Sequence, residues 1–428
     1  MSGKWDDICN SIDTCALAGA AAFFAGIPKA QILANGQLWC YFYALRYLEH
    51  AEYNMAERFH CTQTDNNAVI YGTEEFLLKA LERMQQSECQ PSILLVENSC
   101  SISLIGDDIA GIAGKAALEC PVVAMDCGGL LGGFAEGYAK AGVKLLQVLP
   151  LAVRKPVHKK INLLGLTDFY YNGAADSREI VRILHDAGYL IGAIPGGGST
   201  LECITGLTDA ELNVVINEEL GLPLARFLKQ QYDMPYVIAG VPYGVIGSKK
   251  WLSRIIQIVS TDAKAVFIEC DAAEKKLTAY GNDVSCNWGE PWFDETIICA
   301  PGTMALCIAE AIRSEWINTQ HLQVVCRDKV MYEGMYSIVA DKVYPKEEIE
   351  AALDALLCMD KSILLVGSSN EAAIFMRHNK AISCCNVAYP VNDEILLTQV
   401  PFAGIRGSFY MQQRLWNAFI KNSITTSF

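Results

Sequence analysis

Three cysteines near the start of the chain are the residues best suited to chemistry. Cys15 lies in TCALAGAAAFFAG, Cys40 in NGQLWCYFYA and Cys100 in ENSCSISLIGDDIAG. Thiolates are the ligands that iron–sulfur clusters and other soft metal centres use. The three are separated by 25 and 60 residues, and the chain has no C-x-x-C or other compact iron–sulfur motif. Only folding can bring them together, and on the residues alone structural cysteines are the simpler interpretation.

The surroundings of these cysteines nevertheless favour a site. Gly19 lies close to the first and Gly36 close to the second, and glycine lets a backbone approach a bulky inorganic core. The third directly follows the apolar run 92–97, which predicts a strand. Open α/β sheets bind ligands at the carboxyl ends of their strands, so this location suits a ligand.

Composition and charge narrow the class of protein. Hydrophobic residues make up 52% of the 428 residues and charged residues 19%, which indicates a globular chain. A formal charge of −14 disfavours binding to nucleic acid or to anionic membranes. The acidic chain contains one short basic stretch, which we expect to be a solvated connection between domains: Arg154, Lys155, His158, Lys159 and Lys160.

Cysteine usage and the start of the chain predict a cytoplasmic protein. The apolar stretch 15–28 is shorter than the roughly 20 residues of a membrane span. The first residues, MSGKWDDICNSID, lack the basic end and apolar run of a secretory signal. In the cytoplasm the 17 cysteines stay reduced, as buried hydrophobic residues or metal ligands, and with only six histidines thiolate ligation is favoured over a zinc–histidine site.

Short apolar runs alternate with helical patterns, which predicts an α/β fold with mostly parallel sheets. The expected strands are 92–97, 121–125, 161–165, 189–194, 213–216, 236–239, 264–269, 296–299, 322–326 and 362–366. The clearest expected helices are 74–87, 177–187, 303–315 and 346–357. Two polar seams divide the chain into three Rossmann-like domains, with a C-terminal helix in the last: 1–155, 156–285 and 286–428.

Several segments, in order along nearly the whole chain, resemble the component 1 family of nitrogenase-like oxidoreductases. This family includes the nitrogenase molybdenum–iron subunits, cofactor-assembly scaffolds and dark-operative protochlorophyllide reductase subunits. The segments are CYFYALRYLEHAEYNMAE (40–57), IYGTEEFLLKAL (70–81), CSISLIGDDIAGIA (100–113), NVVINEELGLPLARFLKQQYDMPY (213–236), ILLVGSSNEAAIFM (363–376) and VPFAGIRGSFYMQQRLWNAF (400–419).

The resemblance implies that Cys15, Cys40 and Cys100 ligate a four-iron or larger P-type iron–sulfur cluster. In the family this cluster lies between two related subunits, so the chain is expected to form a homodimer, or a heterodimer or heterotetramer with a related subunit. The partner would complete the ligand set, and Cys9 and Cys61 are weaker candidates within this chain. The family also implies a separate P-loop ATPase iron–sulfur reductase, and no P-loop motif occurs here.

The chain lacks two residues that hold the nitrogenase cofactor in the family, and their absence limits the substrates that we expect it to reduce. Asn217 aligns where the cofactor cysteine of the catalytic subunit would lie, and VPFAGIRG contains no histidine. We therefore expect no iron–molybdenum cofactor and no reduction of dinitrogen. The pattern around Arg406 is more similar to the scaffold and tetrapyrrole-reductase branches, where a pocket between three domains receives an organic substrate or a cofactor precursor.

Four residues are candidates for the wall of that pocket. Gly197, Ser199 and Thr200 belong to the loop IPGGGSTLE, whose backbone N–H groups suit an anionic ligand, although a plain loop is the alternative. Arg406 suits a carboxylate, although a structural arginine is the alternative. The functions left open are a reductase component, a scaffold for metallocluster assembly, and a binding protein without redox chemistry.

Overall fold

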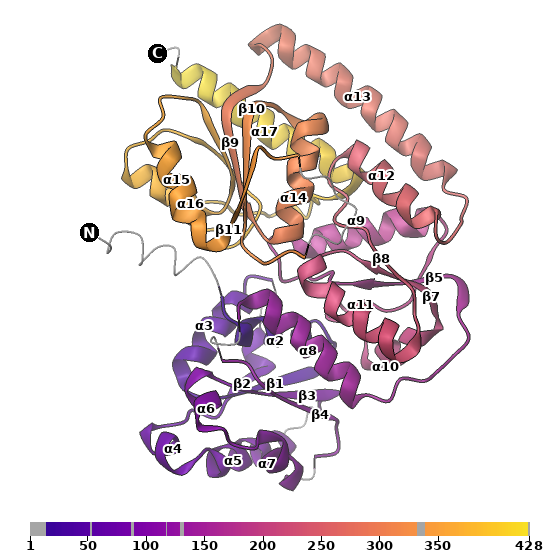
Figure 1. Cartoon of the computed structure of the whole chain (residues 1–428), viewed down its shortest axis with the longest axis vertical. Helices are drawn as coiled ribbons and strands as arrows, with labels where there is room; N and C mark the ends of the chain where they lie inside the picture. The colour runs from indigo at the N-terminus through magenta and orange to yellow at the C-terminus, as the bar shows by residue number, and fades with distance from the viewer. Residues whose placement is uncertain are drawn as a thin grey trace.

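Three α/β units make up the chain. The computed structural model describes residues 14–51, 54–86, 90–116, 118–128, 132–331 and 339–426. Its strands form three sheets of four, four and five strands, and every strand pair in them is parallel. In Figure 1 the first unit lies at the bottom, the second at the right and the third at the top. The predicted α/β class with parallel sheets is confirmed.

The first unit has the strand order β2-β1-β3-β4. Its strands are β1 (Ala30–Asn35), β2 (Phe59–Cys61), β3 (Ile93–Asn98) and β4 (Val122–Asp126). Its helices are α2 (Ala16–Ala25), α3 (Leu38–Leu48), η1 (Met55–Glu57), α4 (Asn66–Tyr71), α5 (Glu74–Gln85), α6 (Cys100–Ile105), α7 (Ile109–Lys115) and α8 (Phe134–Val148). β1 and β3 are buried along their whole length, as expected of central strands covered on both faces.

Helix α2 is fully buried because small residues let its neighbour α8 approach closely. A Cβ on Gly19 would lie 1.9 Å from the carbonyl oxygen of Phe134, and one on Gly137 would lie 1.9 Å from that of Ala16. Both glycines are therefore required for backbone contact between the two helices. This close packing fixes the start of α2, where Cys15 lies.

The second unit repeats this topology, with the order β6-β5-β7-β8. Its strands are β5 (Val157–Leu164), β6 (Leu190–Ile191), β7 (Ala210–Val215) and β8 (Tyr236–Ile238). Its helices are α9 (Gly173–Asp186), α10 (Leu201–Thr205), η3 (Leu207–Asp209), α11 (Glu218–Tyr232), α12 (Val245–Ile256) and α13 (Lys264–Trp288).

The third unit has the order β11-β10-β9-β12-β13. Its strands are β9 (Trp292–Ala300), β10 (Asn318–Cys326), β11 (Lys342–Pro345), β12 (Ile363–Gly367) and β13 (Ser383–Asn386). Its helices are α14 (Gly302–Ala311), η4 (Ile312–Trp316), η5 (Lys346–Glu348), α15 (Ile349–Leu357), α16 (Ser369–Arg377) and α17 (Gly404–Thr426). Helix α17 contacts β13 as well as α9, α12 and α13, so it joins the second and third units (Figure 1).

One predicted strand is wrong. Residues 264–269 begin helix α13, whose buried residues Val266, Cys270, Ala273 and Leu277 recur at helical spacing. The apolar run KAVFIE is short enough to resemble a strand, and the helix is visible only over a longer window. The expected domain boundaries at 155/156 and 285/286 stay predictions, and the second falls inside α13.

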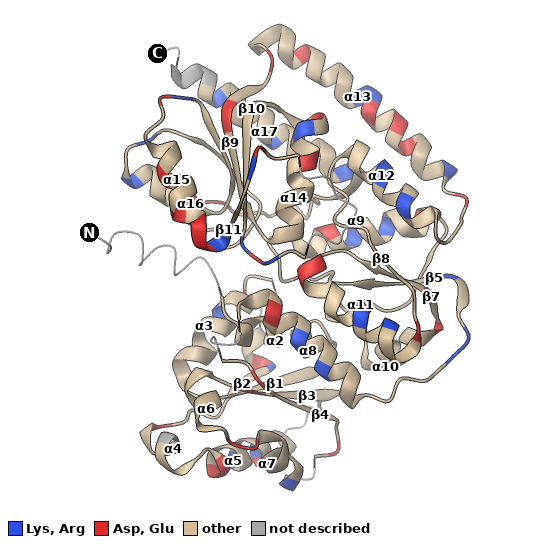
Figure 2. Ribbon diagram, in the orientation of Figure 1, with Lys and Arg blue, Asp and Glu red and all other residues tan. Residues whose placement is uncertain are grey.

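The basic stretch before and in β5 is exposed or half-buried, and three of its side chains pair with acids. Lys160 Nζ lies 2.8 Å from Asp209 Oδ1, and His158 Nδ1 lies 3.1 Å from Glu211 Oε2. Figure 2 shows this blue segment at the right edge of the molecule, beside the red residues of the second unit. These pairs agree with a solvated connection. Among the described residues, no helix combines the length and apolar character needed to cross a membrane.

Candidate functional site

Two of the three cysteines follow the two strands at the switch point of the first sheet. The chain leaves β1 toward β2 on one side, and β3 and β4 lie on the other. Cys40 is in the first turn of α3, shortly after β1, and Cys100 begins α6, two residues after β3. Crevices at such switch points are where open α/β sheets bind ligands. The sequence predicted this place for Cys100, and the structure places Cys40 at the same edge.

Cys15 reaches the same edge from a different direction. It is the residue before α2, and it forms an isolated antiparallel bridge with Gly133 at the start of α8. The N–H of Ala16 donates to the carbonyl oxygen of Gly132 at 3.2 Å. The start of α2 is thereby tied to the loop that follows β4.

The three thiols lie within electrostatic range of one another. Burial raises the pKa of Cys15, and negative charge on Cys100 and on Glu97 raises it further. Burial also raises the pKa of Cys40, with smaller contributions from charge on Cys100 and Cys15. All three pairs therefore interact, and none of the causes that act on these two pKa values is a cation of the protein. A bound metal would supply the missing positive charge and deprotonate the thiols.

The three thiols do not converge on a single metal ion. Within the described ranges, no group of three His, Cys, Asp or Glu side chains is arranged to hold one metal ion. An iron–sulfur cluster takes one thiolate on each of several irons, so its cysteines surround a core and do not converge on a point. The Cys40 sulfur also receives hydrogen bonds from the N–H of Cys100 and the hydroxyl of Ser99, which lower its pKa.

Buried polar side chains hold the strand ends beneath the cysteines. Asn35 donates to Asn98 at 2.9 Å, and Asn98 donates to Asp126 at 2.8 Å, across the ends of β1, β3 and β4. Asn35 also donates to the hydroxyl of Thr73 at 2.9 Å. This row fixes the relative positions of the loops from which α3 and α6 begin.

The two acidic residues of the IGDDI motif have structural roles. Asp108 caps α7 by accepting from the N–H of Gly111 at 3.0 Å. Asp107 accepts from the N–H and the hydroxyl of Thr73 at 2.6 and 2.7 Å, and so fixes the start of α5.

The expectation that Gly19 and Gly36 let the backbone approach an inorganic core is wrong. Gly19 lies against the backbone of α8, as described above. A Cβ on Gly36 would lie 2.2 Å from the hydroxyl oxygen of Ser99. Both glycines make room for protein atoms. Gly128 lies next to a cysteine of the site, since a Cβ there would lie 3.1 Å from the Cα of Cys100, and Gly133 forms the bridge with Cys15.

The weaker cysteine candidates are placed only in part. Cys9 lies outside the described residues. Cys61 ends β2, and its thiol donates to the carbonyl oxygen of Gly36 at 3.4 Å and accepts from the N–H of Gln63 at 3.3 Å. Its hydrogen bonds are therefore with backbone, but burial raises its pKa and charge on Cys40 raises it further, so Cys61 lies within electrostatic range of Cys40.

Large apolar side chains are exposed around Cys40 and Cys100. Trp39 is 68% exposed and Tyr43 67% exposed, and Leu104 on α6 is 74% exposed. In Figure 1 helices α3, α6 and α4 lie along one side of the first unit. We call these exposed residues the aromatic face: Leu38, Trp39, Phe42, Tyr43, Ile70, Tyr71 and Leu104. Trp39, Phe42 and Tyr43 contact one another, and exposed apolar groups of this kind favour an interaction site.

The glycine-rich loop after β6 makes packing contacts. The hydroxyl of Ser199 accepts from the N–H of Ile194 at 2.8 Å, and Thr200 caps α10 by accepting from the N–H of Cys203 at 3.3 Å. A Cβ on Gly197 would lie 2.5 Å from the carbonyl oxygen of Leu166. The N–H of Gly198 donates to the carbonyl oxygen of Gly26 at 2.8 Å, at the end of α2 that lies away from Cys15.

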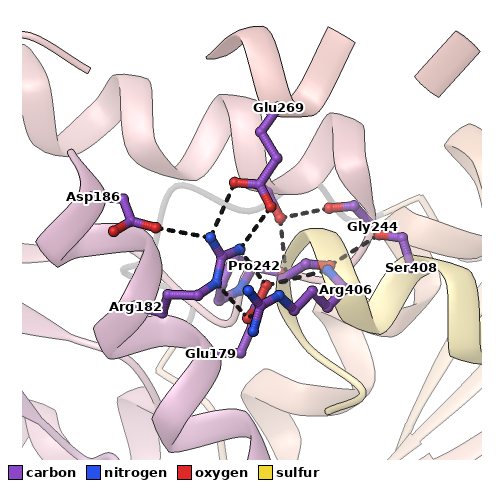
Figure 3. A network of polar contacts seen from close by, with 10 residues as sticks. Glu179, Arg182, Asp186, Pro242, Gly244, Glu269, Arg406 and Ser408 are labelled. Carbon is purple, nitrogen blue, oxygen red and sulfur yellow. Dashed lines mark hydrogen bonds and ion pairs between the residues drawn. The ribbon is translucent and has the colours of Figure 1, made fainter. Parts of the chain in front are cut away.

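Arg406 also lies apart from the cysteines, in a network between the second and third units (Figure 3). Its Nε is 3.8 Å from Glu179 Oε2, and its side chain is 62% exposed. Glu179 pairs with Arg182 at 2.8 Å, and Arg182 also contacts Glu269 at 3.0 Å. The structure therefore does not bring Arg406 or the loop residues to the cysteines, and a ligand role for these four residues stays a prediction.

The match that decides the family covers almost the whole chain. A family model described as "Nitrogenase component 1 type Oxidoreductase" matches residues 15–420. The chain belongs to this family. Its fold agrees, because the solved structure "Nitrogenase Cp1 at pH 6.5" superposes with a TM-score of 0.80 at 14% identity, over 96% of this chain and 93% of that one.

Among curated component 1 relatives, the chain matches one of the subunits of light-independent protochlorophyllide reductase. The protein of Chlorella vulgaris is 23% identical over 385 residues, covering 83% of this chain and 72% of the relative. The protein of Leptolyngbya boryana is 21% identical over 383 residues with the same coverage. These relatives are oxidoreductases, which supports an oxidoreductase role for this component 1 chain.

Within this component 1 chain, sequence reasoning missed a polar group where the three units meet. Arg327 and Asp328 directly follow β10, and they line one cavity together with Tyr170 and Tyr171, which follow β5. Cys100 directly follows a predicted strand, and RDK (327–329) after LQVVC (322–326) carries the same signal. The side chain of Asn217 is buried, and its amide N–H donates to the carbonyl oxygen of Gly165 at 2.8 Å.

Proposed function

We propose that the chain is the cluster-carrying subunit of a nitrogenase-like two-component reductase that does not reduce dinitrogen. The observation that supports this most is the meeting of Cys15, Cys40 and Cys100 at one switch point, within a chain of the component 1 family. An iron–sulfur cluster held there would accept and donate single electrons. The chain's own part is to hold the sulfurs, to donate hydrogen bonds to Cys40 from Ser99 and from the N–H of Cys100, and to limit the access of water.

The proposal includes a paired subunit. The three thiols leave one ligand position of a four-iron cluster to be filled, and helices α3 and α6, which carry Cys40 and Cys100, also carry residues of the aromatic face. A second copy of the chain, or a related subunit, that covered the aromatic face would bury Trp39 and Tyr43 and bring its own ligand to the cluster. A separate ATPase iron–sulfur protein would deliver the electrons.

The proposal is tested by anaerobic purification of the full chain, followed by iron analysis and absorption near 400 nm. We expect iron and the absorption in the wild-type protein, and the loss of both in Cys40→Ala or Cys100→Ala. Cys120→Ala is the matched control, because Cys120 is a half-buried cysteine of the same unit outside the site. A folded wild-type protein without iron would contradict the proposal.

A second measurement separates the reductase from an assembly scaffold. Mixing the reduced ATPase partner with the chain and ATP should oxidise the partner and reduce the cluster of the chain, as followed by absorption. Release of the cluster to a third protein, with no ATP-dependent oxidation, would favour a scaffold.

A further inference from the structure

Helices α8 and α11 form a surface groove between the first and second units. The two helices pack directly on each other, because a Cβ on Gly142 would lie 2.8 Å from the side chain of Leu224. Beside this contact lies an open groove with a volume of about 530 Å³. Its residues on α8 run from Ala135 to Gln147, which is a length of about 18 Å at 1.5 Å per residue. The groove is therefore about as long as three turns of another helix.

The floor of the groove is apolar. Ala139 and Val143 of α8, Leu222 and Pro223 of α11, and Met331 contribute to it. Val143 is half-buried, Pro223 is exposed and Met331 is 51% exposed, so apolar surface of both helices is open to solvent. Apolar surface between two packed helices is the kind of site that receives the apolar side of a third helix.

The exposed charges around this floor are mostly positive. Lys140 and Lys144 lie about one turn apart on α8, Arg226 lies on α11, and Lys329 follows β10. All four residues are exposed. Figure 2 shows blue residues on both α8 and α11. Cations from both helices thus border the apolar floor, although the chain as a whole has a formal charge of −14.

The three lysines of the groove are not neutralised within the described ranges of the chain. Lys140, Lys144 and Lys329 form no ion pair there, and Lys140 donates to the carbonyl oxygen of Asp126 at 3.1 Å. Exposed lysines on a strongly acidic chain otherwise have many acids to pair with. These three are therefore available to acidic groups of another molecule.

The acids that line the groove leave this positive charge in place. Glu218 and Glu219 are buried, and Glu219 accepts from the N–H and the hydroxyl of Thr303 at 3.2 and 2.5 Å. Glu136 is exposed, and it accepts from the N–H of Gly133 at 2.9 Å. The surface that a partner would meet is apolar in the middle and cationic at its borders.

The distribution of the cations selects among possible occupants. A fatty acid carries one charge at one end, whereas the cations here lie along the groove and on both helices. A nucleic acid would leave the apolar floor uncovered and would be repelled by the charge of the chain. An amphipathic helix with acidic residues on both flanks would cover the floor and meet several cations at once.

We propose that the groove between α8 and α11 binds an amphipathic helix of a protein partner, whose apolar side covers the floor and whose acidic residues lie beside the three lysines. The groove shares no residue with the aromatic face, so it is a separate interaction surface. The inference does not depend on the iron–sulfur cluster or on the pairing of subunits.

Synthetic peptides test this docking on the full chain purified without oxygen. The probe is a fluorescein-labelled helical peptide of about 14 residues, with Leu on one side and Glu on both flanks. We expect it to bind, as measured by fluorescence anisotropy. A peptide with Lys in place of every Glu should bind at least about tenfold more weakly, and so should one with Pro at its centre, which breaks the helix. No binding of the acidic helix, or equal binding of any two peptides, would overturn the proposal.

Substitutions in the groove locate the peptide. Lys144→Glu reverses one charge, so it should weaken binding of the acidic peptide about fivefold and strengthen binding of the basic peptide. Lys264→Glu is the matched control, because Lys264 is an exposed lysine of α13 that does not line the groove. Val143→Asp puts a carboxylate in the floor and should weaken binding of the acidic peptide at least about tenfold. Equal behaviour of Lys144→Glu and Lys264→Glu would overturn the assignment, whether or not Val143→Asp folds.

Competition identifies the kind of occupant. Dodecanoate and a single-stranded oligonucleotide are each titrated into the complex with the labelled acidic peptide. We expect neither to displace the peptide, because neither combines an apolar side with charges along both flanks. Displacement by dodecanoate that is lost in Lys144→Glu would make the groove a site for small anionic amphiphiles and would overturn the docking of a helix. Displacement by the oligonucleotide would overturn it in favour of nucleic acid.

Discussion

The carboxyl edges of the first and third sheets use polar residues in opposite ways. At the first, Cys15 and Cys40 are half-buried, their pKa values are raised, and exposed aromatic rings surround them. At the third, Arg327 is buried and paired with Glu371, which is fully buried. The first edge holds these two thiols near the surface without a charged partner among the described residues. The third edge neutralises the charge of Arg327 inside the fold. The third edge thus pairs its buried charge within the chain, whereas the pKa values of the two thiols at the first edge are affected by no cation among the described residues.

The largest expected effect is at the carboxyl edge of the third sheet. Glu371→Ala leaves the Arg327 guanidinium buried without its carboxylate, and we expect the free energy of unfolding to fall by about 3–5 kcal/mol. Urea denaturation followed by circular dichroism measures this. Glu75→Ala, which breaks the exposed pair with Lys79, is the control and should leave stability unchanged. A loss no larger than that of the control would show that the ion pair is not what stabilises this edge.

At the carboxyl edge of the first sheet, we expect a substitution in the aromatic face to weaken the association of subunits. Tyr43→Asp places a charge in the aromatic face, and we expect the subunit pair to dissociate about 100-fold more readily, because burying an unpaired charge and losing an aromatic contact both oppose binding. Sedimentation velocity measures the assembly state. Ile268→Asp, at an equally exposed apolar residue of α13, should have no effect. Equal behaviour of the two variants would remove the aromatic face from the interface.

The smallest effect concerns the thiols themselves. After iron is removed with a chelator, the raised pKa values of Cys15 and Cys40 leave less thiolate, so alkylation at pH 8 should be slower than at exposed Cys358, on the order of tenfold. Their rates should keep rising above pH 9, as followed by mass spectrometry. In the iron-loaded protein both cysteines should be protected. Alkylation as fast as that of Cys358 would contradict the electrostatic description of the site.

Much of the fold follows from local pattern, because strands buried on both faces read as apolar runs. ILLVEN of β3 and ILLVG of β12 were predicted in this way. The strand SCCN of β13 was missed because its residues are small and polar, and only its position beside β12 makes it a strand. Pairing with a strand that is distant in the sequence imposes no recognisable residue pattern on such a short segment.

The candidate site was predictable only in part. The resemblance selected Cys15, Cys40 and Cys100, and the structure brings their thiols within electrostatic range. The contacts of Arg406 and of the glycine-rich loop were not predictable, because they depend on how the units pack. The hydroxyl of Tyr170 gave no signal either, because only the packed structure shows that it has no partner among the described residues.

Helix α2 runs from Cys15 of the candidate site to the boundary with the second unit. Its ten residues span about 15 Å, with Cys15 at one end and Gly26 at the other. Gly26 abuts the second unit, where a Cβ would lie 2.0 Å from the carbonyl oxygen of Gly196. Because α2 is also packed along its length against α8, it sets the position of Cys15 relative to the glycine-rich loop of the second unit.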